Sequence, residues 1–289
     1  MRLRTAIFGI LLFLQSALVL TGGAVRLTGS GLGCPTWPEC TPGSYTPVPH
    51  QAEGQLHAWI EFGNRLLTFA LLFAALAAVI YVLKTGRKDL RSLAAGQVLG
   101  IIGQGVLGGI TVLTDLHPLP VAGHLLLSMF LIAGATSLYS RRHEPQLKVC
   151  APTKTVSLLS KSHIAISFIV LILGTIVTGS GPHAGDEKAQ RFGFDIRSVA
   201  ILHADAVIFL MGLTIALLVA ASVTHSTKKA IYIFFAISLA QGGVGYAQYL
   251  TGIPEALVAA HLAGATVFWI AAWRIRLSVV RTSQQERDQ

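Results

Sequence analysis

Four histidines of this chain lie inside long apolar segments, where ionisable side chains usually face a functional site. They are His57, His124, His203 and His261. Two imidazoles on facing helices of an apolar bundle suit the two axial positions of a haem. Hydrogen bonding between helices is the alternative for such residues, and zinc is a weaker one because few carboxylates and thiols accompany them. The pattern therefore predicts haem ligation, with one candidate pair of histidines in each half of the chain.

A second polar group stands at the head of an apolar run, in the segment HAWIEFGNR at residues 57–65. His57, Glu61 and Asn64 fall on one face of a helix, because residues four and seven apart align. Arg65 follows Glu61 at a spacing of four, which suits an ion pair at a helix start. The other interpretation is a site in which His57 is a ligand and Glu61 an acid–base group beside a bound substrate.

The two halves of the chain carry a repeat. Residues 104–124 read QGVLGGITVLTDLHPLPVAGH, and residues 241–261 read QGGVGYAQYLTGIPEALVAAH. Both segments begin with Gln-Gly and end with His at the same interval, since 124 − 104 and 261 − 241 are both 20. If each half has four helices, both halves enter the membrane from the same side, as in a parallel repeat.

The repeat also isolates one departure in the first half. His203 precedes His261 by 58 residues, whereas Asn64 precedes His124 by 60 and His57 precedes it by 67. The position that matches His203 is therefore closer to Asn64, and asparagine is a poor ligand for haem iron.

The elements that must carry these residues are apolar blocks of about 20 residues, the length that crosses a hydrocarbon core. The chain is 53% hydrophobic and 12% charged, against about 25% charged in a soluble domain. The blocks cover residues 5–25, 57–83, 93–113, 119–139, 158–179, 198–222, 229–250 and 255–277. We expect an all-α polytopic membrane protein, whose eight transmembrane helices form two pseudo-twofold-related four-helix bundles, residues 1–145 and 146–289.

The distribution of charge predicts the orientation of these helices. The formal net charge is +9, but the basic residues are not gathered as a nucleic-acid site requires. They fall at alternate connections and at the ends: Arg2, Arg4, Lys84, Arg87, Lys88, Arg91, Arg141, Arg142, Lys228, Lys229, Arg274 and Arg276. The positive-inside rule places these connections and both termini in the cytoplasm, in contact with the surface of the lipid bilayer. We expect no nucleic acid as a partner.

Two of the three cysteines, Cys34 and Cys40 in CPTWPEC, fall in the first connection on the opposite, oxidising side. They have the spacing of neither a CxxC pair nor a c-type haem attachment motif. A disulfide that acts as a structural staple, a redox-active pair that exchanges with a partner thiol, and two unpaired thiols all remain open. The third, Cys150, falls in a connection on the cytoplasmic side.

Three features together carry a resemblance to a known family: GGAVRLTGSGLGCPTWPEC, IEFGNR, and the paired histidines within an eight-segment repeat. Over nearly the whole length the chain resembles haem A synthases. These enzymes oxidise the C8 methyl of haem O to a formyl group, which gives haem A for terminal oxidases. The resemblance implies this activity, haem O as substrate, haem b as cofactor and the bacterial plasma membrane as location. Haem O synthase and the machinery of terminal oxidase assembly are candidate partners.

The resemblance also implies roles for individual residues. His203 and His261 would be the axial ligands of haem b in the C-terminal half. The N-terminal half would hold haem O, with His124 as one ligand of its iron. Glu61 resembles the essential catalytic carboxylate of the family, and Cys34 and Cys40 resemble its outer-loop cysteine pair.

The chain departs from the family at Asn64. The family motif is Glu-x-x-His-Arg, and here Asn64 stands where the motif has histidine, before Arg65. Either His57 replaces it as a ligand or the substrate iron has one protein ligand only; we favour His57. The substrate haem site is therefore predicted to comprise His124, His57, Asn64 and Arg65. A second outer-loop cysteine pair, present in some members, is absent here.

Two other functions were weighed against this one. A dihaem b-type cytochrome that passes electrons in the membrane would explain the histidines, but neither Glu61 nor the cysteine pair. A transporter built from repeats would be expected to have broken helices or charges near the middle of the membrane. Only Asp205 is a candidate for such a charge.

Overall fold

The structure is a computed structural model that describes residues 2–143, 152–187, 189–220 and 224–280. The predicted boundary at residues 145 and 146 and Cys150 lie outside these residues. The described part contains eight long α-helices, one short 3-10 helix and no strand, which confirms the predicted all-α class. The elements are α1 (Arg2–Leu27), α2 (Gln55–Lys84), η1 (Lys88–Leu90), α3 (Arg91–Leu113), α4 (Pro118–Ser140), α5 (Lys154–Ser180), α6 (Ile196–Val219), α7 (His225–Leu250) and α8 (Glu255–Val280).

All eight long helices have the length and hydropathy of membrane spans. The shortest, α3 and α4, have 23 residues each and the longest, α2, has 30. At a rise of about 1.5 Å per residue, even 23 residues exceed the roughly 30 Å of a hydrocarbon core. Helices satisfy their own backbone hydrogen bonds, which the interior of a bilayer requires. The chain is therefore a multi-pass membrane protein.

Capping residues explain where several helices begin. The side chains of Thr153, Asp195 and Thr224 accept hydrogen bonds from backbone N–H groups in the first turns of α5, α6 and α7. Because Thr224 caps α7, that helix starts four residues before the predicted block at 229. His225, which precedes the predicted block, is consequently the first residue of α7. His117 caps α4, where Pro118 occupies the first turn.

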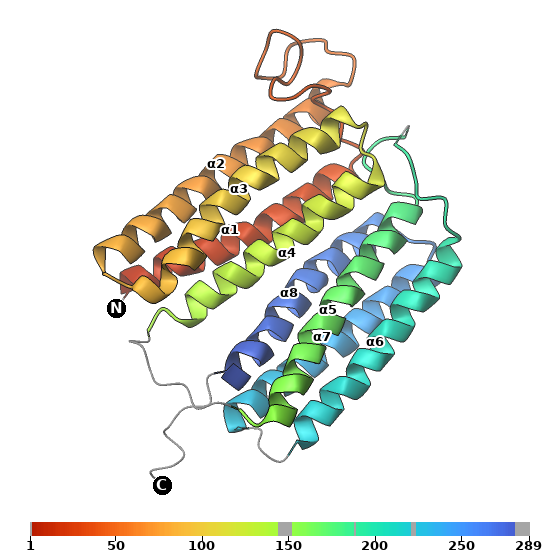
Figure 1. The fold of residues 1–289 in the computed structure, drawn as a ribbon. Helices are drawn as coiled ribbons and strands as arrows, with labels where there is room; N and C mark the ends of the chain where they lie inside the picture. Colours follow the sequence, from red (N-terminus) through yellow and green to blue (C-terminus); the bar gives the residue numbers. More distant parts are fainter. Residues whose placement is uncertain (1, 144–151, 188, 221–223, 281–289) are drawn as a thin grey trace.

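The helices form two groups that follow each other along the chain (Figure 1). In the first group α1 packs against α2 and α4, and α3 packs against the same two helices. In the second group α5 packs against α6 and α8, and α7 packs against the same two. Contacts between the groups join α4 to α8, α1 to α8 and α4 to α5. The list of contacting helices is unchanged when α1–α4 are exchanged with α5–α8. The pseudo-twofold relationship itself stays a prediction.

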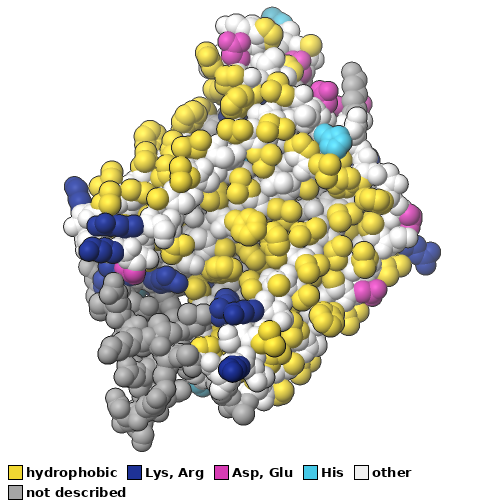
Figure 2. Space-filling view, in the orientation of Figure 1, with side chains coloured by type: hydrophobic (Ala, Val, Ile, Leu, Met, Phe, Trp, Pro, Cys, Tyr) yellow, Lys and Arg dark blue, Asp and Glu magenta, His cyan; other side chains and the backbone are white. Residues whose placement is uncertain are grey.

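The surface of the bundle is broadly hydrophobic, and most of the Lys and Arg side chains visible in this view lie toward one end (Figure 2). The 27-residue connection between α1 and α2 projects from the opposite end (Figure 1). This connection covers residues 28–54 and is the longest described connection between helices. We call this the outer end, after the predicted orientation.

Candidate functional site

His203 and His261 face each other inside the second helix group. His203 comes from α6 and His261 from α8, and their ring centroids are 6.4 Å apart with the planes at 73°. An imidazole nitrogen binds a metal at about 2 Å and lies about 1 Å from its own ring centre, so two axial imidazoles have centroids about 6 Å apart. The observed separation fits one iron between the two rings. The structure thus brings together the pair that the sequence predicted.

Glycines make room for three of the histidine rings. A Cβ on Gly174 of α5 would lie 3.4 Å from Cε1 of His203, and one on Gly245 of α7 would lie 3.4 Å from Cε1 of His261. In the first group a Cβ on Gly108 would lie 3.3 Å from Cε1 of His124. The Gly108–His124 and Gly245–His261 contacts are related by the repeat, because 245 − 108 and 261 − 124 are both 137. Each ring therefore packs against a helix that approaches it without a side chain.

Hydrogen bonds between the described helices do not occupy the Nδ1 atoms of two of these rings. The Nδ1 atoms of His124 and His261 are buried and have no hydrogen-bond partner among the described residues. Interhelical hydrogen bonding, the alternative for these residues, would have given each ring a polar partner. Within the same part of the chain no three side chains of His, Cys, Asp or Glu come together as a metal cluster, so a conventional zinc site is not formed there.

Asn64, like His203, lies beside the first helix of its group. A Cβ on Gly22 of α1 would lie 4.0 Å from Nδ2 of Asn64, just as Gly174 of α5 abuts His203. Thr21 donates a hydrogen bond to Oδ1 of Asn64 at 2.7 Å. The asparagine is thus held against α1 by a hydroxyl group.

His57 lies in the first turns of α2 and is held by the start of the α1–α2 loop. Its Nδ1 atom is 3.2 Å from the carbonyl oxygen of Gly29 and 3.2 Å from Oγ of Ser30. A neutral ring that donates its Nδ1–H to the Gly29 carbonyl has the lone pair on Nε2 left for a metal. This arrangement is compatible with His57 as a ligand, although His57 and Asn64 contact different parts of the molecule.

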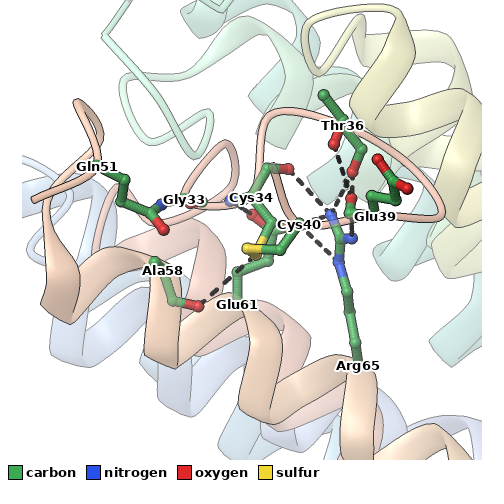
Figure 3. A network of polar contacts seen from close by, with 9 residues as sticks. All are labelled: Gly33, Cys34, Thr36, Glu39, Cys40, Gln51, Ala58, Glu61 and Arg65. Carbon is green, nitrogen blue, oxygen red and sulfur yellow. Dashed lines mark hydrogen bonds and ion pairs between the residues drawn. A yellow bond between two sulfur atoms is a disulfide. The ribbon is translucent and has the colours of Figure 1, made fainter. Parts of the chain in front are cut away.

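Glu61 is 6% exposed, and its carboxylate is held from both sides (Figure 3). The backbone N–H of Cys34 donates to Oε2 at 2.7 Å, and Arg65 donates to Oε1 from Nη2 at 2.5 Å and from Nε at 3.1 Å. The predicted ion pair is therefore present. It is also connected to the outer loop through the Cys34 N–H. The role of Glu61 as an acid–base group beside a substrate stays a prediction.

Arg65 has a further set of partners that sequence reasoning missed. Its guanidinium donates to the backbone carbonyls of Cys34, Thr36 and Glu39, at 3.0 to 3.2 Å (Figure 3). The planar fork of an arginine suits such convergent acceptors. Backbone carbonyls carry no signature in the sequence. Only the presence of a long loop before α2 could have indicated that Arg65 has partners there.

A disulfide between Cys34 and Cys40 closes the loop segment above Glu61. Both cysteines are fully buried. Gln51 donates a hydrogen bond to the Gly33 carbonyl at 2.6 Å, and a Cβ on Gly33 would meet the backbone of His57 at 2.4 Å. The loop therefore packs directly on the start of α2. The structure confirms the disulfide as a bond; whether it exchanges with a partner thiol stays a prediction.

A connection of the second helix group also reaches this region. Arg26 near the end of α1 donates to the carbonyls of Thr178, at 2.8 Å, and of His183. The backbone N–H of Gly31 donates to the carbonyl of Gly185 at 2.9 Å. A pocket of about 280 Å³ opens between the two loops, lined by Gly29, Leu32, Gly33, Ala52, Glu53, His57 and Asp186. The His57 side of the site is thus bordered by residues of both helix groups.

Comparison with known proteins places this architecture in a family. The family model described as cytochrome oxidase assembly protein (COX15-CtaA) matches residues 5–185. A protein named haem A synthase from Shewanella oneidensis is 31% identical over 175 residues, which are 56% of this chain and 51% of that one. A haem A synthase from Sinorhizobium fredii is 25% identical over 323 aligned residues, 92% of this chain and 87% of that one.

A third relative, the haem A synthase of Geobacillus thermodenitrificans, is 28% identical over 119 residues. The match covers 40% of this chain and 35% of that relative, so the chain spans about a third of the Geobacillus protein and about half of the Shewanella protein. The family model covers more than half of the chain and includes the disulfide loop, Glu61 and His124. The chain belongs to the cytochrome oxidase assembly protein family.

Proposed function

We propose that this protein is a haem A synthase, an oxidoreductase that converts the C8 methyl group of haem O into the formyl group of haem A for terminal oxidases. The observation that carries the proposal is the Glu61 carboxylate. It is buried, oriented by Arg65 and the Cys34 N–H, and placed at the outer end of a helix group that also presents His57 and His124. A plain electron-carrying cytochrome has no use for such a carboxylate.

The proposal assigns different haems to the two helix groups. His203 and His261 hold haem b in the C-terminal group, residues 146–289, where their facing geometry suits two axial ligands. The N-terminal group, residues 1–145, binds haem O through His124, with His57 as second ligand. Asn64 lies beside that site on α2, and haem b when bound supplies one-electron transfer.

Glu61 and Arg65 of the N-terminal group have different roles in the reaction. Oxidation of a methyl to a formyl group removes protons and electrons and adds one oxygen atom. Glu61 accepts a proton at its carboxylate, which requires the proton to come within hydrogen-bond reach. Arg65 is a positioning residue: it fixes the carboxylate and ties α2 to the outer loop.

Replacement of Glu61 by glutamine tests this function. The Glu61→Gln protein is expected to retain its haems and to form little haem A when supplied with haem O, because the shape is kept and the proton acceptor is lost. Glu255→Gln, at the exposed start of α8, is the control and is expected to keep full activity. Full activity of Glu61→Gln would remove Glu61 from the mechanism.

The haems extracted from the purified protein separate this function from its rival. Haem b together with haem O or haem A supports the synthase. Haem b alone supports the dihaem cytochrome, and no haem at all would leave both without a basis. Haem O synthase, as the source of the substrate, and the oxidase assembly machinery are the partners that this function requires.

A further inference from the structure

An unpartnered carboxylate lies on the outward face of α6, inside the membrane span. Asp205 comes nine residues after the start of α6 at Ile196 and 14 residues before its end at Val219. At 1.5 Å per residue it stands about 14 Å from one end of the helix and about 21 Å from the other. It is therefore within the hydrocarbon layer, where an ionisable side chain is costly unless it meets a polar group.

The helical positions show that Asp205 faces away from the bundle. His203 points inward, and so do the buried Leu210, Thr214 and Leu217. Asp205 follows His203 by two residues, which turns it by about 200° around the helix. No hydrogen bond or ion pair of the described residues involves its carboxylate, and it is exposed. Asp205 is thus exposed on the outer surface of the bundle, on the side of α6 opposite the space between His203 and His261.

Asp205 belongs to an exposed seam with a regular spacing. The seam consists of Ile201, Asp205, Ile208, Gly212, Ile215 and Val219, all exposed and alternately four and three residues apart. Apolar residues at this spacing with one polar member are typical of a helix that packs along another helix, where the polar residue sets the register. A glycine in the seam permits close approach of the backbones.

We propose that this seam binds a transmembrane helix of another protein, which carries a lysine or arginine at the depth of Asp205. Charge complementarity selects this partner over a second copy of the chain. A second copy in the same orientation could offer to Asp205 only the side chains that this chain itself has at the depth of Asp205. Lys161 lies seven residues from the opposite, inner end of its helix, and Arg65 is engaged by Glu61 and the outer loop. Neither can meet Asp205.

Binding of model helices to the full-length protein in liposomes tests this inference. The probe is a 23-residue Leu/Ala transmembrane peptide with a single lysine at its middle, and the matched peptide has leucine there. Energy transfer between labelled peptide and labelled protein reports association. We expect the lysine peptide to bind the wild type roughly 5- to 30-fold more tightly than the leucine peptide, as interhelical hydrogen bonds in membranes allow.

The variants make the result specific to Asp205. Asp205→Leu is expected to erase the difference between the two peptides, and Ile208→Leu, on the same seam, is expected to keep it. Haem content and thermal unfolding of each variant confirm that it is folded, and Asp205→Asn replaces Asp205→Leu if that protein fails to fold. Equal binding of both peptides to the wild type would overturn the proposal. Association of labelled copies with one another, lost in Asp205→Leu, would also overturn it in favour of a second copy.

Discussion

At the scale of single residues, the site depends on side chains that hold other side chains. Glu61 has one oxygen on the backbone of Cys34 and the other on Arg65, so its position is set by the loop as much as by α2. His57 is likewise oriented through Nδ1 by Gly29 and Ser30. Partners of this kind commonly fix the tautomer and direction of a functional histidine.

Arg65→Lys should loosen the loop without removing the charge. A lysine retains one contact to Glu61 but cannot reach three carbonyls with a planar fork. We expect a loss of about 1–3 kcal/mol in the free energy of unfolding, and faster reduction of the Cys34–Cys40 disulfide by a soluble thiol. Arg197→Lys, in the exposed first turn of α6, is the control. Equal reduction rates in the wild type and Arg65→Lys would show that Arg65 does not hold the loop.

Asn64→His should create a second pair of facing imidazoles. Asn64 lies beside α1, and His203 lies beside α5, the first helix of the other group, so a histidine at position 64 would place an imidazole in a comparable setting. In a background of His57→Ala and His261→Ala, which leaves one predicted histidine ligand in each helix group, we expect Asn64→His to raise the fraction of low-spin ferric haem. Electron paramagnetic resonance measures that fraction, with Asn64→Gln as the control. An unchanged spectrum would separate Asn64 from the haem site.

The residue-level predictions succeeded where spacing was enough. The pairing of His203 with His261 and of Glu61 with Arg65 followed from the repeat and from helical periodicity, and the structure confirms both contacts. The bonds from Arg65 to loop carbonyls could not be predicted, because every residue has a carbonyl and only the folded loop selects which ones converge. The ligand roles of His57, His124, His203 and His261 stay predictions.

At the scale of elements, the outer loop is fitted to the helices by close contacts with glycine. A Cβ on Gly109 of α3 would lie 2.6 to 2.9 Å from three ring atoms of Trp37. The Trp37 indole therefore lies directly on the backbone of α3. One residue earlier, Gly108 abuts His124, so the same turn of α3 receives both the loop and the histidine.

Gly109→Ala should displace Trp37 and release the loop from α3. Alanine favours a helix over glycine by about 1 kcal/mol, but overpacking costs about 1–3 kcal/mol. We expect proteolysis within residues 28–54 to become several-fold faster in proteoliposomes. Gly96→Ala in the same helix meets open space and should show only the favourable helix effect. Similar cleavage of both variants would mean that Trp37 does not anchor the loop.

The number and type of the elements were predictable because each apolar block is bounded by polar connections. The block at 57–83 became α2 at Gln55–Lys84, and the block at 198–222 became α6, which ends earlier, at Val219. The predicted start of α7, at residue 229, was wrong because the helix begins at its cap, Thr224, before the apolar block begins. The docking of the α5–α6 loop through Arg26 had no local signal, since its partners are carbonyls more than 150 residues away.

At the scale of the whole molecule, the two helix groups meet along α4 and α8, and this interface is not symmetric. Trp269 of α8 is 2% exposed and donates from its indole to the Met129 carbonyl of α4 at 2.6 Å. One turn further, Trp273 donates to Oγ of Ser137 at 2.7 Å. The repeat offset of 137 places Ile132 of α4 opposite Trp269 in the pattern. The C-terminal group therefore supplies the large side chains that join the groups.

Trp269→Phe should weaken the contact between the two helix groups. It should lower the free energy of unfolding more than a Trp→Phe substitution at the surface does. The variant removes a buried hydrogen-bond donor and leaves part of the indole volume empty, although the Met129 carbonyl can still accept within α4. We expect the free energy of unfolding to fall by about 1–3 kcal/mol. Trp59→Phe, which is 52% exposed at the start of α2, should change it by less than about 0.5 kcal/mol. Unfolding in detergent, followed by the far-ultraviolet helix signal, measures both. If the two variants lose equal stability, the groups are held together by the loops at the outer end, through Arg26 and Gly31, rather than by α4 and α8.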